Sequence, residues 1–94
     1  METVHDDKRL RSIYDAGQGY IYNDFEGDHR TKSSAESNKL HRAGCAQCDP
    51  RRDRNAMTTQ TSGQKIFFAT RKEAFDWLME HRAGNYTRCV VCNA

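Results

Sequence analysis

The clearest pattern of hydrophobic and polar positions lies in the last third of the chain. Lys65 to Ala69 is a short apolar run that is typical of a buried strand. Thr70 to Glu73 follows with the spacing of a capping box, in which a threonine and a glutamate cap the start of a helix. Because Ala83 and Gly84 supply a C-terminal stop, the pattern predicts a helix from about Arg71 to Arg82.

The predicted helix has one largely apolar face. The spacing i, i+3, i+4 and i+7 joins Phe75, Leu78, Met79 and Arg82, with Ala74 and Trp77 beside them. A chain of 94 residues has few other large apolar side chains, so we expect the aromatic residues of this region to form most of the core. These are Phe67, Phe68, Phe75 and Trp77.

A second patterned segment lies near the N-terminus. Leu10, Ile13 and Tyr14 have helical spacing, the pattern stops at residues 16–19, and Tyr20 to Tyr22 is prone to form a strand. A short helix followed by a strand is therefore predicted. Together with the later strand and helix, this predicts an α+β domain with a short β-sheet and one main C-terminal α-helix.

Polar connectors separate these segments. Asn23 to Lys39 and Asp49 to Gln64 are rich in polar residues, and we interpret both as exposed loops. We treat residues 1–94 as a single zinc-binding domain, in which residues 1–38 hold the helix, the strand and a polar loop. Residues 39–92 then form the metal-binding core.

The composition suggests that apolar burial alone does not stabilise this core and that a cross-link between parts of the chain is needed. The chain is only 36% hydrophobic, and a domain this short buries a small share of its surface. No apolar stretch has the length of a membrane span, and Met1 to Arg11 is charged, unlike a secretory signal. We therefore expect a cytoplasmic protein without a membrane partner, in which paired cysteines indicate metal rather than disulfides.

Four cysteines form two C-x2-C pairs, Cys45 with Cys48 and Cys89 with Cys92. This spacing lets two thiolates chelate one ion through a tight turn, and two such pairs predict a closed structural Zn²⁺ site. His41 lies four residues before Cys45, which is also a chelating separation. Spacing alone favours Cys45, Cys48, Cys89 and Cys92, with His41 as the alternative to Cys48.

Basic residues are concentrated in the half of the chain that holds the cysteines, although the net charge is only +2. One hypothesis is that they bind nucleic acid through phosphate contacts, supported by the amide donors of the predicted helix start. The alternative is a solvated loop. The candidate residues are Arg51, Arg52, Arg54, Arg71 and Lys72.

The order of these features resembles the Ada-type metal-binding module. The resemblance covers residues 39–92 and rests on Lys39 to Cys45, on Ile66 to Thr70 with Glu73 and Ala74, and on the final C-x2-C pair. Related small zinc modules are attached to bacterial nucleases and restriction proteins. The resemblance implies a bacterial or phage protein associated with DNA, with His41, Cys45, Cys89 and Cys92 as ligands.

In that family the first cysteine accepts a methyl group from a DNA phosphotriester, and His41 stands at the corresponding position. The resemblance therefore removes the family's nucleophile, and a metal-thiolate methyl acceptor is only a lesser alternative. The chain offers no H-x-E or H-E-x-x-H motif and no evident acid–base pair, so we do not expect an enzyme.

A protein-interaction module is the remaining alternative. It would use exposed aromatic side chains to bind a larger enzyme or a second copy of the chain, although we expect a monomer. The candidate aromatic residues are Tyr20, Tyr22, Phe25 and Trp77.

Overall fold

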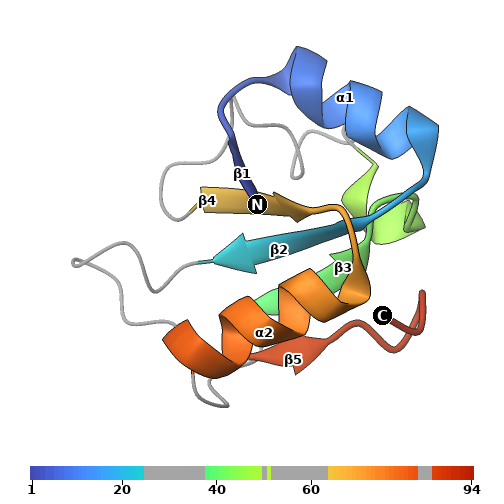
Figure 1. Cartoon of the computed structure of the whole chain (residues 1–94). Helices are drawn as coiled ribbons and strands as arrows, with labels where there is room; N and C mark the ends of the chain where they lie inside the picture. Colours follow the sequence, from blue (N-terminus) through green and yellow to red (C-terminus); the bar gives the residue numbers. More distant parts are fainter. Residues whose placement is uncertain (25–37, 50, 52–63, 83–85) are drawn as a thin grey trace.

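The computed structural model describes residues 1–24, 38–49, 51, 64–82 and 86–94. Its strands are β1 (Glu2–Val4), β2 (Tyr20–Asp24), β3 (Lys39–Arg42), β4 (Gln64–Phe68) and β5 (Thr87–Arg88). Its helices are α1 (Asp7–Ala16) and α2 (Arg71–His81), with a single turn of 3-10 helix, η1 (Ala46–Cys48). The protein therefore has the α+β fold that the sequence predicted, and α2 is its main C-terminal helix (Figure 1).

One five-stranded sheet, in the order β1-β4-β2-β3-β5, brings together segments that are far apart in the sequence (Figure 1). The centre of the sheet is antiparallel: Ile21 in β2 lies opposite Phe67 in β4 on one side and His41 in β3 on the other. β5 pairs parallel with β3, so Leu40 lies opposite Arg88. This last pairing places the second cysteine pair beside β3.

The two helices cover opposite faces of the sheet. Because side chains alternate along a strand, Ile21 and Tyr22 point to different faces. Ile21 packs with Leu10 and Ile13 of α1, whereas Tyr22 packs with Leu78 of α2. The result is two separate apolar clusters, one on each face.

Capping interactions define both helix starts. The side chain of Asp6 accepts a hydrogen bond from the Arg9 amide, and the Thr70 side chain accepts one from the Glu73 amide. These bonds satisfy amide groups that have no partner within the helix. α2 begins at Arg71, as predicted, and its last helical residue is His81, with Arg82 as the C-terminal cap.

Several structural details differ from the sequence prediction. β1, β3 and β5 were not predicted, and Asp24, which we placed in a loop, ends β2 with no exposed surface. Its carboxylate accepts hydrogen bonds from Arg82 and Gln64. The ion pair with Arg82 compensates the Asp24 carboxylate for the hydration that it loses on burial.

The predicted apolar face of α2 was wrong in one respect. Met79 is 69% exposed, and the residues of α2 that are buried are Ala74 and Leu78. The buried face of the helix therefore includes the small side chain of Ala74 and excludes Met79. Among the described residues, neither helix has the length or apolar content that a membrane crossing requires. Most of the two predicted polar loops lies outside the described residues.

Candidate metal centre

The candidate metal centre begins with His41, which β3 holds at the edge of the α1 cluster. His41 is paired with Ile21 across the sheet and is only 4% exposed. Among the residues that the structure describes, no group forms a hydrogen bond with its Nδ1 atom, although that atom is buried. A buried polar atom without a partner is costly, and a bound metal ion is one partner that can satisfy an imidazole nitrogen.

The second part of the centre is the turn from Cys89 to Cys92. The Cys89 amide donates a hydrogen bond to the Leu40 carbonyl, which continues the β5 pairing and places Cys89 next to His41. The Arg42 amide lies 3.3 Å from the Cys92 sulfur, and the Ala94 amide bonds back to the Cys89 carbonyl. Backbone amides therefore fix this turn against β3.

Four ligand atoms converge in this place. The side chains of His41, Cys45, Cys89 and Cys92 each offer one atom, and these atoms all lie within 4.8 Å of one another. The sulfurs of Cys45 and Cys89 are 4.0 Å apart. Two sulfurs bound to a tetrahedral zinc ion at about 2.3 Å would lie about 3.8 Å apart, so the spacing suits such an ion.

The electrostatics of these side chains agree with metal binding. Burial, together with the nearby charges of Lys39 and Lys65, lowers the pKa of His41 to about 4. The imidazole is therefore neutral at neutral pH, which is the form that binds metals. Burial raises the pKa of the Cys89 thiol, but hydrogen bonds from Cys92, Val91 and Cys45 more than offset this and lower the pKa.

Cys48 is buried beside this group but does not belong to it. It packs with the other cysteines, yet the four atoms that lie close together come from His41 and the other three cysteines. Cys48 ends the short helix η1, and its amide donates a hydrogen bond to the Cys45 carbonyl. Burial raises the pKa of the Cys48 thiol, which favours the neutral form.

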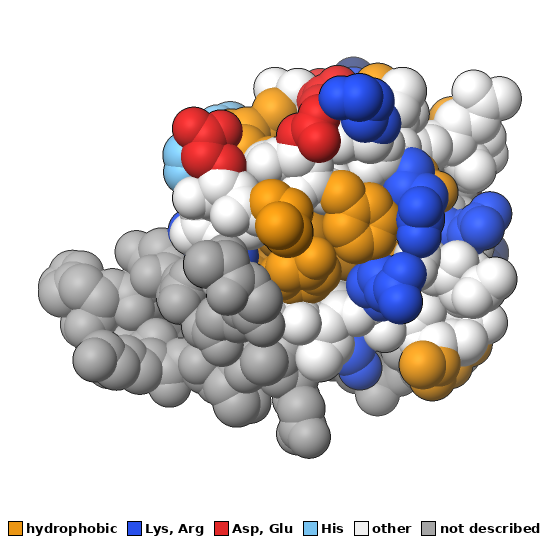
Figure 2. Space-filling view, turned by 60° about the horizontal axis from the view of Figure 1, so that its bottom comes forward, with side chains coloured by type: hydrophobic (Ala, Val, Ile, Leu, Met, Phe, Trp, Pro, Cys, Tyr) orange, Lys and Arg blue, Asp and Glu red, His pale blue; other side chains and the backbone are white. Residues whose placement is uncertain are grey.

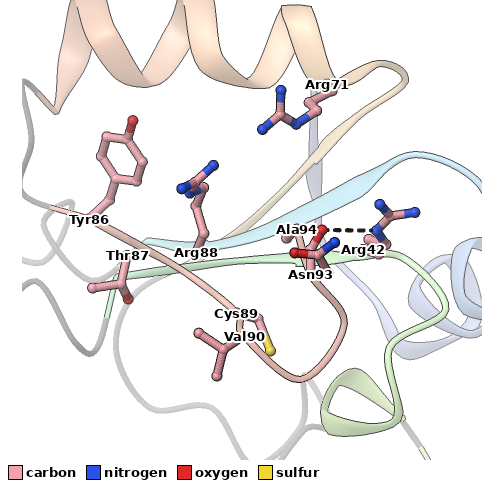
Figure 3. Close-up of a pocket in the computed structure, with 9 residues that line it drawn as sticks. All are labelled: Arg42, Arg71, Tyr86, Thr87, Arg88, Cys89, Val90, Asn93 and Ala94. Atoms are coloured by element: carbon pink, nitrogen blue, oxygen red, sulfur yellow. Dashed lines mark hydrogen bonds between the residues drawn. The ribbon is translucent and has the colours of Figure 1, made fainter.

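A pocket of about 750 Å³ adjoins the metal centre at Cys89. Arg42, Arg71 and Arg88 line it from β3, α2 and β5, together with Tyr86 and Val90 (Figure 3). Arg42 Nε donates a hydrogen bond to the Asn93 carbonyl at 3.3 Å. Within the described part of the chain, none of these arginines forms an ion pair with a carboxylate.

The residues predicted to bind nucleic acid have different surroundings where the structure describes them. Arg71 lines the pocket, whereas Arg51 is bound to Asp49 and Lys72 to Asp76. Arg52 and Arg54 lie outside the described residues. The sequence analysis missed Arg42 and Arg88, although each lies directly beside a candidate ligand in the chain, and that adjacency is the signal that would have found them.

The aromatic residues predicted for a protein interface do not form an exposed patch in the described structure. Tyr22 is fully buried, and Tyr20 and Trp77 pack partly against the same core. Phe25 lies outside the described residues. The alternative in which Tyr22 is exposed fails because β2 is a central strand whose α2 face is covered.

Comparison of the chain with protein-family models, curated proteins and solved structures found no match. The resemblance to the Ada-type module therefore stays a prediction.

Proposed function

We propose that this protein is a non-catalytic, structural zinc-binding module that binds DNA through backbone phosphates. The single observation that supports it best is the convergence of four ligand atoms, from His41 and three cysteines, within 4.8 Å. One nitrogen and three sulfurs are a common donor set of structural zinc sites, and four protein ligands leave no position for a catalytic water.

Such a zinc ion would join two parts of the chain. His41 and Cys45 belong to β3 and the turn after it, while Cys89 and Cys92 follow β5. The apolar clusters are small, and a structural zinc ion contributes on the order of 10 kcal/mol to folding. The ion's role in this proposal is to hold the C-terminal turn on the sheet.

DNA binding is supported by the charge of the adjoining pocket. Arg42, Arg71 and Arg88 come from three different elements and gather in one hollow without a carboxylate partner among the described residues. Nearby positive charges repel one another, so an anion such as a phosphate stabilises their arrangement. Arg71 is also the first residue of α2, where the helix dipole is positive.

The first test measures zinc in the wild type, His41→Ala and Cys48→Ser. We expect about one zinc ion per chain in the wild type and in Cys48→Ser, and rapid release of zinc from His41→Ala. The measurement is metal analysis with release to a chromophoric chelator. Retention by His41→Ala and loss by Cys48→Ser would instead support the site of four cysteines.

DNA binding is then tested on the zinc-loaded wild type, Arg71→Ala and Arg9→Ala by fluorescence anisotropy of a labelled duplex across a salt series. Removal of one phosphate contact lowers the slope of log K against log salt by about 0.9, and this is expected for Arg71→Ala. Arg9→Ala is the matched control, because Arg9 is paired with Glu2 and belongs to α1 on the other face. A duplex that does not bind at low salt would exclude the DNA proposal while leaving the zinc proposal intact.

A second candidate function, protein interaction, is favoured by the two valines in the metal-binding turn. Val90 is 91% exposed and Val91 is 63% exposed. Apolar residues held in water by a rigid turn are common contacts for another protein. The third alternative, a thiolate methyl acceptor, requires an accessible sulfur, and Cys92 is the only cysteine of the described group that is not fully buried.

A further inference from the structure

Aromatic rings lie beside the pocket that Arg42, Arg71 and Arg88 line, and contacts with the phosphates of a DNA backbone would not require them. Phe75 and Tyr86 lie with their ring centroids 6.4 Å apart, and the Arg71 guanidinium lies 4.6 Å from the centre of the Phe75 ring. Arg88 approaches the same ring at 5.9 Å. On the side of the molecule that carries α2 and β5, hydrophobic side chains lie next to Lys and Arg side chains (Figure 2).

The two kinds of side chain suit the two parts of a nucleotide. Guanidinium groups bind phosphate by paired hydrogen bonds, and an aromatic ring offers a flat surface on which a base can stack. Tyr86 lines the pocket and is only partly buried, and Val90 adds an apolar wall. Phe75 already has Arg71 over its ring, so Tyr86 is the ring better able to receive a base.

The shape of the site favours an unpaired nucleotide over a duplex. A volume of about 750 Å³ falls within the range of small-molecule sites, which is about 300–1,000 Å³. In a duplex the bases are stacked inside, so only phosphates and groove edges can reach a hollow of this kind. An unpaired base can leave its neighbours and enter the pocket.

We propose that this pocket binds one unpaired nucleotide of a single-stranded nucleic acid, with its phosphate against Arg42, Arg71 and Arg88 and its base on Tyr86. The inference rests on the proposed binding of DNA and narrows it from any phosphate backbone to single strands, ends or gaps. The proposed zinc ion would contribute to nucleotide binding only indirectly. By binding Cys89 it would hold in place the β5 segment that carries Arg88.

The test compares a labelled oligothymidylate with a blunt duplex of equal length, using the zinc-loaded wild type, Tyr86→Ala, Tyr86→Phe and Arg88→Ala. We expect tighter binding of the single strand. Loss of one stacked base weakens binding by roughly 5- to 150-fold, so Tyr86→Ala should lose at least fivefold on the single strand and nothing on the duplex. Tyr86→Phe should retain binding, and Arg88→Ala should weaken both complexes. Zinc content and thermal midpoint must be equal in all four proteins.

Each contrary outcome has a distinct meaning. Equal or tighter binding of the duplex, with no effect of Tyr86→Ala, would overturn this inference and leave the proposed DNA-binding function intact. If the protein bound neither the single strand nor the duplex, both this inference and the proposed DNA-binding function would be overturned. If thymidine monophosphate competed as strongly as the oligonucleotide, the ligand of the pocket would be a free nucleotide and the inference of a bound strand would be overturned. If polyglutamate competed equally well, the ligand would be an acidic protein surface, which would also overturn the inference.

Discussion

At the scale of single residues, position 19 strictly requires a residue without a side chain. Its φ angle is +87°, and a Cβ atom placed on it would lie 2.6 Å from both the Phe67 ring and the Phe68 carbonyl oxygen. Gly17 also has a positive φ angle, +68°, but a Cβ atom there would meet nothing within 4 Å. The two glycines share the backbone conformation and differ in the space around them.

This difference predicts unequal effects of the same substitution. Gly17→Ala should lower the free energy of unfolding by about 1 kcal/mol, because only the left-handed conformation is penalised. Gly19→Ala should lower it by about 3 kcal/mol, since overpacking against β4 is added to that penalty. Urea denaturation of both zinc-loaded variants measures the difference. Equal losses would show that β4 moves away freely from Gly19.

The limits of sequence analysis are also clearest at this scale. The spacing of Cys45, Cys89 and Cys92 was sufficient to expect that they meet, and they do. Spacing favoured Cys48 over His41 as the fourth ligand, although both have a chelating separation from Cys45, whereas the structure groups His41 with the other three cysteines. The position of His41 beside Cys89 depends on the pairing of β3 with β5, a long-range feature that local spacing does not contain.

At the scale of secondary structure, α2 depends on the cap at its first turn. The Thr70 hydroxyl accepts a hydrogen bond from the Glu73 amide at 3.2 Å, and the next residue, Arg71, lines the pocket. A helix whose first amides lose their acceptor frays from that end. The cap therefore holds one wall of the proposed phosphate site in place.

We accordingly predict that Thr70→Ala lowers the free energy of unfolding by about 1 kcal/mol. In a domain of this size such a loss lowers the thermal midpoint by roughly 4–8 °C. Thr70→Ser is the matched control, because serine retains the hydroxyl acceptor. The measurement is thermal unfolding followed by circular dichroism, and an equal loss in Thr70→Ser would mean that the methyl group, rather than the cap, stabilises this helix start.

The elements that the sequence predicted correctly are those with a strong local pattern. β2, β4 and both helices have apolar spacing and capping residues that are typical of their structure. β1, β3 and β5 have between two and four residues, and their pairing partners lie far away in the chain. A strand of this length is defined by its neighbours in the sheet and not by its own residues.

At the scale of the whole molecule, the proposed zinc ion would link segments that little else holds together. β5 has only two residues, and its pairing with β3 is the edge of the sheet. The apolar contacts of α2 with Tyr22, Leu40 and Phe68 form one small cluster. Loss of the ion would therefore free the C-terminal turn and expose that cluster.

This arrangement predicts that removal of the metal unfolds most of the protein. Treatment with a strong chelator should abolish cooperative thermal unfolding, since a structural zinc ion contributes about as much free energy as a small domain has in total. Addition of Zn²⁺ should restore the transition, and Mg²⁺ should not. An unchanged midpoint after verified metal removal would show that the apolar clusters suffice.

The strand order has a consequence for how the protein is made. β4 lies between β1 and β2, and β3 receives its outer neighbour only from Thr87 and Arg88. Until the ribosome has translated Gln64–Phe68, the strand that joins β1 to β2 does not exist. The nascent chain must therefore keep Ile21 and Tyr22 unpaired on one side, where chaperones can bind them. Completion of the sheet waits for translation of Thr87 and Arg88, and the candidate metal centre is complete only after Cys89 and Cys92 have followed them.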